Sequence, residues 1–212
     1  MDVFEEIKRW LPGFTPGVVV DAGAFTGNFS RRAREAWDAK VYAFEPSLRN
    51  FARLIGRVDA GVIAYNVALG MQDAVGFVET QPDPSMDRVV MSGDGGGKAV
   101  EIQKLDGLGL PDIDFLKIDT EGSDLHVLRG ARQMLSEGRI GLVQVEAGMN
   151  PDNQWHVPAR YFHSMLEPMG FRLFSIGETA MEWPEKKPYM RRADLVFISP
   201  RLIEEYRGKG WA

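Results

Sequence analysis

The chain has 212 residues, of which 44% are hydrophobic and 26% charged, so it can bury one substantial core and lacks the composition of a disordered protein. Its formal net charge of −5 argues against a general affinity for nucleic acid, because binding to phosphate backbones needs a basic excess. The absence of cysteine excludes disulfides, thiolate nucleophiles and cysteine-ligated metals.

The N-terminal residues predict a short amphipathic helix rather than a targeting signal. They lack the basic and apolar regions of a signal peptide, and no apolar run in the chain approaches the ~20 residues that a membrane span needs. We therefore expect a cytoplasmic protein without membrane insertion. The apolar residues that recur at helical spacing ahead of the Pro12-Gly13 break are Val3, Phe4, Ile7, Trp10 and Leu11.

Residues 18–27, Val-Val-Val-Asp-Ala-Gly-Ala-Phe-Thr-Gly, carry the most informative pattern of the chain. The β-branched run predicts a buried strand that delivers a cofactor to its carboxyl end. Gly23 and Gly27 can adopt positive φ and let a ligand lie against bare backbone. The spacing is Asp-x-Gly-x-x-x-Gly, so the Gly-x-Gly-x-x-Gly fingerprint of dinucleotide sites is absent. This favours a nucleoside cofactor without phosphates, and S-adenosylmethionine is the obvious candidate.

Strands and helices alternate along most of the remaining chain. We expect helices at 28–37, 47–55 (with Ser47 placed to cap it), 125–135 and 158–169, and strands at 40–44, 62–65, 115–118, 140–145, 171–176 and 194–198. Short runs at 75–78, 88–91 and 100–103 predict a small meander inserted on the edge of the main unit.

This order predicts a Rossmann-like α/β fold. We expect a single domain whose mostly parallel seven-stranded sheet has helices on both faces and a final antiparallel hairpin. Within it, residues 1–17 form a lead-in, 18–73 the cofactor-binding half, 74–105 the insertion, and 106–212 the catalytic and acceptor half.

Four carboxylates, Asp21, Glu45, Asp119 and Glu146, follow predicted strands and should meet on one rim of the sheet. We expect Glu45 to accept hydrogen bonds from both ribose hydroxyls, and Asp21 to orient the turn or the methionine amine of the cofactor. The segment 66–68 is placed to border the adenine. The candidate cofactor-binding residues are Asp21, Gly23, Ala24, Phe25, Gly27, Glu45, Pro46, Asn66, Val67, Ala68 and Asp119.

Segments 19–24, 41–46, 66–70 and 115–122 resemble the successive motifs of FkbM-type S-adenosylmethionine-dependent methyltransferases. The most specific is Lys-Ile-Asp-Thr-Glu-Gly at 117–122, followed by a helix containing Val-Leu-Arg-Gly-Ala at 127–131. Asp124 stands where many members of that family have a second glutamate. The resemblance spans residues 18–198 and implies a class I methyltransferase fold. It also implies O-methylation of a hydroxyl on a sugar, glycan or polyketide-like small molecule.

Methyl transfer to an aliphatic hydroxyl is helped by a base, and the candidate catalytic residues are Glu121, Asp119 and His156. In one hypothesis Asp119 and Glu146 bind a divalent cation, for which Mg²⁺ is suited, and Glu121 is the base. In a second, Glu121 or His156 acts directly as the base while Asp119 organises the loop. In a third, Asp119 and Glu121 only cap the following helix.

Two loops on the same rim, residues 147–157 and 177–192, are long enough to form an acceptor pocket. Their aromatic and basic side chains suit a sugar with phosphate or carboxylate groups, although such charges are also common on solvated surfaces. The candidate acceptor residues are Trp155, His156, Trp183, Lys186, Lys187 and Arg191. Two other functions stay open: a nucleoside-binding module without turnover, and an NAD-dependent oxidoreductase, which the missing glycine disfavours.

Overall fold

The computed structural model describes residues 2–92, 97–182, 187–207 and 209, and its centre is a seven-stranded sheet. The strands of this sheet are β1 (Val18–Ala22), β2 (Lys40–Phe44), β3 (Val62–Tyr65), β8 (Ile113–Ile118), β9 (Ile140–Gly148), β10 (Arg172–Met181) and β11 (Met190–Ile198). They lie in the order β10-β11-β9-β8-β1-β2-β3. Pairing is parallel from β3 to β9, whereas β11 runs antiparallel to both β9 and β10. The predicted parallel sheet and final antiparallel hairpin are confirmed.

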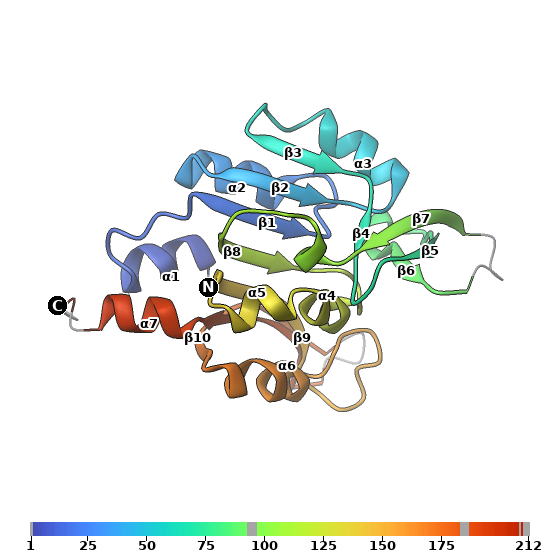
Figure 1. The fold of residues 1–212 in the computed structure, drawn as a ribbon. Helices are drawn as coiled ribbons and strands as arrows, with labels where there is room; N and C mark the ends of the chain where they lie inside the picture. The colour runs from blue at the N-terminus through green and yellow to red at the C-terminus, as the bar shows by residue number, and fades with distance from the viewer. Residues whose placement is uncertain (1, 93–96, 183–186, 208, 210–212) are drawn as a thin grey trace.

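Helices cover both faces of this sheet (Figure 1). One face packs against α1 (Val3–Trp10), α2 (Asn28–Trp37), α3 (Leu48–Ile55) and α7 (Pro200–Tyr206), and the other against α4 (Asp124–Gly130), α5 (Arg132–Ser136) and α6 (Ala159–Leu166). Ile7 and Leu202 are buried in the first layer, and Leu128 and Phe162 in the second. Since apolar residues face helices on both sides, the central strands are near-continuous hydrophobic runs. Within the described part of the chain, no helix is long and apolar enough to cross a membrane.

The helix predicted at 125–135 is two helices, α4 and α5, which meet at Ala131. The carboxylate of Asp106, in the 3₁₀ turn η2 (Leu105–Gly107), accepts hydrogen bonds from the amides of Gln133 and Met134. The Asp106 side chain thus caps the first turn of α5. The local sequence pattern does not reveal this helix start, because the capping residue lies in another segment. Gly130 is the last residue of α4. A Cβ atom at this position would lie 1.9 Å from the carbonyl oxygen of Gly70, so a larger residue would not fit.

The other helix ends differ from expectation in smaller ways. The predicted helix at 158–169 is α6, with Pro158 at its N-cap, followed by the 3₁₀ turn η3 (Glu167–Met169). Helix α7 was not predicted, although Ser199 caps it and Pro200 opens its first turn. Ser47 occupies the N-cap of α3, but its hydroxyl makes no cap and donates to Asp87 instead.

The predicted insertion forms a sheet of its own rather than an extension of the main sheet. Its strands are β4 (Ala68–Leu69), β5 (Ala74–Glu79), β6 (Arg88–Val90) and β7 (Lys98–Gln103), in the order β4-β7-β5-β6. The order is not a meander, because β4 follows β3 closely along the chain and pairs parallel with β7. In Figure 1 the arrowheads of β1, β2 and β8 point toward this inserted sheet, which therefore faces the carboxyl ends of the main strands.

Candidate active site

The turn after β1 is held close to the turn after β8. Gly23 has φ +77° and Gly27 has φ +83°, as expected. A Cβ atom on Gly23 would lie 1.8 Å from the carbonyl oxygen of Asp119, and one on Gly27 would meet Leu54 and Val58. The missing side chains of both glycines thus leave room for neighbouring protein atoms, while the backbone of Gly23 also lines the cavities described below.

Beneath this turn lies a buried charge cluster. The Asp21 side chain is fully buried, accepts a hydrogen bond from Ser30 Oγ (2.7 Å), and pairs with Lys117 Nζ (3.1 Å). Lys117 also donates to the carbonyl oxygen of Gly23 (2.9 Å) and lies 3.4 Å from Asp119. Burial by itself would lower the pKa of Lys117, but the charges of Asp21 and Asp119 outweigh burial and raise it. Lys117 thus links the buried carboxylate of Asp21 to the backbone of the turn.

Glu45 follows β2 and is held by backbone amides on both sides. Its Oε2 accepts from Phe25 N and its Oε1 from Ser47 N, each at 2.8 Å. Burial raises the pKa of Glu45 to about 7, although these two hydrogen bonds act in the opposite direction. Asn66 donates to the carbonyl oxygens of Glu45 and Pro46. Asn66 therefore holds the loop after β2 and does not border the cavity described next.

A first cavity of about 270 Å³ lies between the ends of β1, β2 and β8 and the inserted sheet. Six of the predicted cofactor residues line it: Gly23, Phe25, Glu45, Pro46, Ala68 and Asp119. Val67, which was also predicted, packs against the hydrophobic core instead.

A second cavity of about 410 Å³ adjoins the first, since Gly23, Phe25 and Asp119 line both. Ala24 lines the second cavity, which extends past the start of α1 to Glu178 on β10 and to Asp194 on β11. Burial raises the pKa of Asp194 to about 7, and the nearby Glu146 adds to this shift. The two cavities therefore adjoin along the carboxyl rim, and the acidic Asp119 is one of the residues that they share.

Three carboxylates meet beside these cavities. Asp119, Glu121 and Glu146 each offer an oxygen atom within 4.8 Å of the others. Glu121 has φ +51°, and its buried Oε2 has no hydrogen-bond partner among the described residues. Burial, followed by the charges of Asp119 and Glu146, raises the pKa of Glu121 to about 7. Ser123, and neither Asp119 nor Glu121, is the N-cap residue of α4, and its side chain makes no cap hydrogen bond.

Glu146 is already engaged on both of its oxygens. Its Oε2 lies 2.7 Å from Nε2 of His156, and its Oε1 pairs with Arg192, which also lies 3.6 Å from Glu178. The other ring nitrogen of His156 lies 2.9 Å from Nδ2 of Asn153. His156 is thus brought into the site as predicted, but both of its nitrogens have protein partners.

The predicted acceptor residues are only partly brought together. The Trp155 side chain is exposed. Its backbone lies beside the Glu121 turn, since a Cβ atom on Gly122 would lie 2.8 Å from the carbonyl oxygen of Trp155. The guanidinium of Arg88, on β6, lies 5.3 Å from the Trp155 ring centroid. Lys187 is exposed, Arg191 is partly buried, and neither lines the two cavities. Trp183 and Lys186 lie outside the described residues.

Sequence reasoning missed three residues of the site. Lys117 had a usable signal, since it is the one charged residue of the apolar strand predicted at 115–118. His126 is exposed and lines the first cavity. Asp87 lines the same cavity from the inserted sheet, and nothing in its local sequence indicates this.

Comparison with known proteins agrees with this geometry. A family model described as the methyltransferase FkbM domain matches residues 21–175. A curated relative, the hexuronic acid methyltransferase AglP of Haloferax volcanii, is 29% identical over 119 residues, which are 53% of this chain and 50% of that protein. The chain thus spans about half the length of this relative.

Two solved structures share the fold. A methyltransferase FkbM from Methylobacillus flagellatus KT has a TM-score of 0.56 and 17% identity, covering 87% of this chain and 45% of that one. A precorrin-6y C5,15-methyltransferase from Geobacter metallireducens GS-15 has a TM-score of 0.51 and 13% identity, covering 92% and 86%. At these identities the likeness shows a common fold.

Proposed function

We propose that this chain, which belongs to the FkbM methyltransferase family, transfers the methyl group of S-adenosylmethionine to a hydroxyl of a sugar, glycan or polyketide-like small molecule. The observation that supports the proposal is the pair of adjoining cavities on the sheet rim. Glu45 and Glu121 line the first cavity, and Asp119 lines both. A nucleoside held at Glu45 would then share its cavity with the two carboxylates.

The first cavity suits an adenosyl sulfonium better than a dinucleotide. Each oxygen of Glu45 accepts one backbone hydrogen bond and keeps a lone pair for a ribose hydroxyl. Among the described residues that line this cavity there is no lysine or arginine, whereas Glu45, Asp87, Asp119 and Glu121 are present. A pyrophosphate would meet uncompensated acids there, but a positively charged sulfonium is favoured. This charge pattern supports S-adenosylmethionine over NAD.

The donor supplies an already activated methyl group, so the chain has mainly to align the acceptor oxygen and accept its proton. We assign the proton to Glu121, because its pKa of about 7 allows it to be ionised and still basic at neutral pH. His156 is less suited, since Glu146 and Asn153 engage both ring nitrogens. We propose that His156 and Arg192 hold Glu146 in place.

The acidic surroundings favour a neutral hydroxyl as the acceptor group. A carboxylate would be repelled by Asp119, Glu121 and Glu146, which are mutually close. The curated relative is named for a hexuronic acid, a sugar that carries hydroxyls as well as a carboxylate. Its name supports a sugar acceptor here, and the exposed ring of Trp155 beside the Glu121 turn suits packing against a sugar.

The alternative is a mechanism in which a divalent cation activates the acceptor hydroxyl. The three carboxylates are oxygen donors of the kind that Mg²⁺ prefers, and Asp119, Glu121 and Glu146 would hold it. Such a cation would polarise the acceptor hydroxyl. The engagement of both Glu146 oxygens by His156 and Arg192 favours the metal-free route.

The variant Glu121→Gln tests this assignment. Glutamine keeps the shape of the side chain but cannot accept the proton, so turnover should fall by roughly 10²–10⁴-fold. The Kd of S-adenosylhomocysteine should stay unchanged. Methylated product from a panel of sugars and glycans is measured by mass spectrometry, with the exposed Glu204→Gln on α7 as the control. Undiminished turnover would remove Glu121 from the mechanism, and binding without any product from the wild type would favour a nucleoside-binding module.

A further inference from the structure

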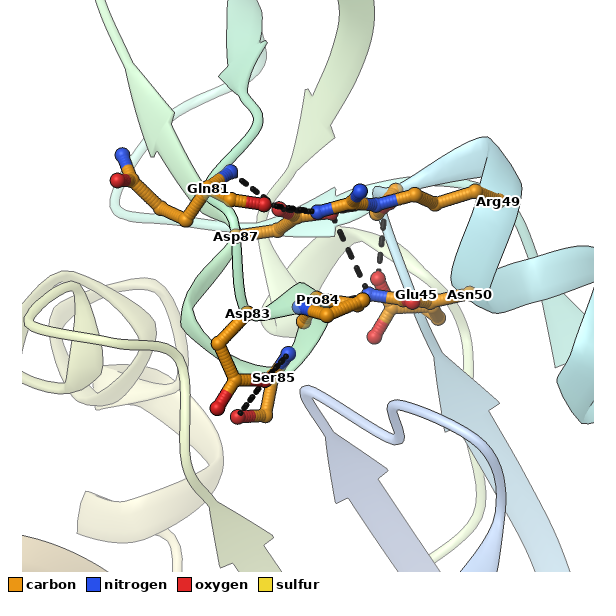
Figure 2. A network of polar contacts seen from close by, with 9 residues as sticks. Glu45, Arg49, Asn50, Gln81, Asp83, Pro84, Ser85 and Asp87 are labelled. Carbon is orange, nitrogen blue, oxygen red and sulfur yellow. Dashed lines mark hydrogen bonds and ion pairs between the residues drawn. The ribbon is translucent and has the colours of Figure 1, made fainter.

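The carboxylate of Asp87 belongs to the insertion but lies against the start of α3. Its side chain is only 2% exposed, and it accepts hydrogen bonds from Ser47 Oγ (2.7 Å) and from the amide of Gln81 (2.8 Å). The guanidinium of Arg49 binds it through two nitrogens and also donates to the carbonyl oxygen of Gln81 (2.7 Å). Figure 2 shows Arg49 reaching from α3 to this carboxylate. The insertion and α3 are therefore joined by a charged contact in which the carboxylate is buried and the guanidinium is 38% exposed.

This contact keeps Asp87 ionised. Burial alone would raise the pKa of Asp87, but hydrogen bonds from Arg49, Gln81 and Ser47 outweigh burial and lower it. The acceptor of these bonds is thus a carboxylate anion, and charge-assisted hydrogen bonds of this kind are about twice as strong as neutral ones.

Ser47 connects Asp87 to Glu45. Its hydroxyl donates to Oδ2 of Asp87, while its backbone amide donates to Oε1 of Glu45 (2.8 Å). Next along α3, Asn50 donates to the carbonyl oxygen of Pro84 (2.9 Å), which belongs to the 3₁₀ turn η1 (Pro84–Met86) of the insertion. Both Ser47 and Asn50 are buried, so the bonds lie away from water. Movement of Asp87 would be passed to Glu45 through a single residue.

The same contact builds part of the first cavity. Ser85, Asp87, Val89 and Met91 line it from the insertion, whereas Glu45 lines it from the end of β2. Docking of the insertion on α3 therefore both closes the cavity and fixes its ribose-binding carboxylate.

We propose that Asp87 is a positioning residue for the nucleoside end of the methyl donor, acting through Ser47 on Glu45. The inference rests on the proposed function, since the orientation of Glu45 matters to a ligand only when a ribose is bound. Asp87 itself need not contact the ribose. Its effect should therefore appear in donor affinity and not in the chemical step.

The first experiment measures S-adenosylhomocysteine affinity of Asp87→Asn by titration calorimetry. We expect the Kd to rise about tenfold, the size of one lost charge-assisted hydrogen bond, with kcat at saturating donor within about twofold of wild type. The matched control is Glu101→Gln. Glu101 lies on β7 of the same insertion and is exposed, and its carboxylate accepts a hydrogen bond from Gln103. Its substitution should leave the Kd unchanged.

A ligand without ribose hydroxyls separates positioning from general destabilisation. For the 2′,3′-dideoxy analogue of S-adenosylhomocysteine, wild type and Asp87→Asn should bind about equally, because Glu45 has no hydroxyl to hold. Ser47→Ala, which keeps the amide bond to Glu45 but removes the bond to Asp87, should weaken S-adenosylhomocysteine binding by a similar factor. The double variant should be no weaker than either single one.

Equal affinity of wild type and Asp87→Asn for S-adenosylhomocysteine would overturn the inference alone. An equal loss for the dideoxy analogue would also overturn it, because the effect would then not pass through the ribose. Failure of the wild type to bind S-adenosylhomocysteine would contradict the proposed function itself.

Discussion

Lys117→Met removes the only charge that β8 contributes to the buried cluster under the β1 turn, while keeping a side chain of similar length. In this variant the carboxylates of Asp21 and Asp119 lose their shared cation, and the carbonyl oxygen of Gly23 loses a donor. Asp21 is fully buried and cannot recover this interaction from water. We therefore expect a large loss of stability and a displaced β1 turn.

The magnitude follows from the burial of each partner. Removing one member of a buried ion pair costs about 3–5 kcal/mol. The Asp119 side chain is 43% exposed, so solvent screens its share and the lower part of that range applies. For a chain of this size each kcal/mol lowers Tm by about 2–4 °C, so the expected decrease is roughly 6–12 °C.

Scanning calorimetry of wild type and variant at pH 7 measures this decrease. The control Lys8→Met, at an exposed position on α1, should leave Tm nearly unchanged. The double variant Asp21→Asn with Lys117→Met should recover much of the loss, because removing both charges of a buried pair is often nearly neutral. A Lys117→Met variant within about 1 kcal/mol of wild type, or a double variant below the single one, would refute the reasoning.

Two further predictions concern pH and metal. Glu45, Glu121 and Asp194 each have a raised pKa of about 7, so between the ordinary carboxyl range and pH 7 the folded chain holds protons that the unfolded chain has released. The stabilisation from these bound protons is complete below the ordinary carboxyl pKa and is lost as pH rises through 7. Tm should therefore be higher at pH 5.5 than at pH 8. A higher Tm at pH 8 would contradict the conclusion that burial raises the pKa of these three carboxyl groups. Treatment with EDTA should leave methyl transfer unchanged, whereas a loss that Mg²⁺ restores would favour a cation at Asp119 and Glu146.

The sequence was sufficient to predict the elements whose pattern is local. The bounds of α2 and β2 were predicted without error, because each has the periodicity of its type and clear ends. The position of Glu45 and Asp119 beside one cavity agrees with the rule that parallel strands end on the same edge. That rule requires only the order of elements.

The rest depended on contacts between distant segments. The bond between Ser47 and Asp87 joins residues 40 positions apart, and the cap of α5 comes from Asp106. The missing Cβ of Gly23 leaves room for the backbone of Asp119, a contact that the sequence pattern did not indicate. In each case the residue type was informative, but its partner is set by tertiary packing.

The most direct test is a crystal structure of the wild-type chain soaked with S-adenosylhomocysteine. The proposed function predicts density in the first cavity, with both ribose hydroxyls within hydrogen-bond distance of Glu45 and the sulfur directed toward Asp119 and Glu121. An empty cavity at saturating ligand, or a nucleoside bound with its ribose away from Glu45, would contradict the assignment of this cavity to the methyl donor.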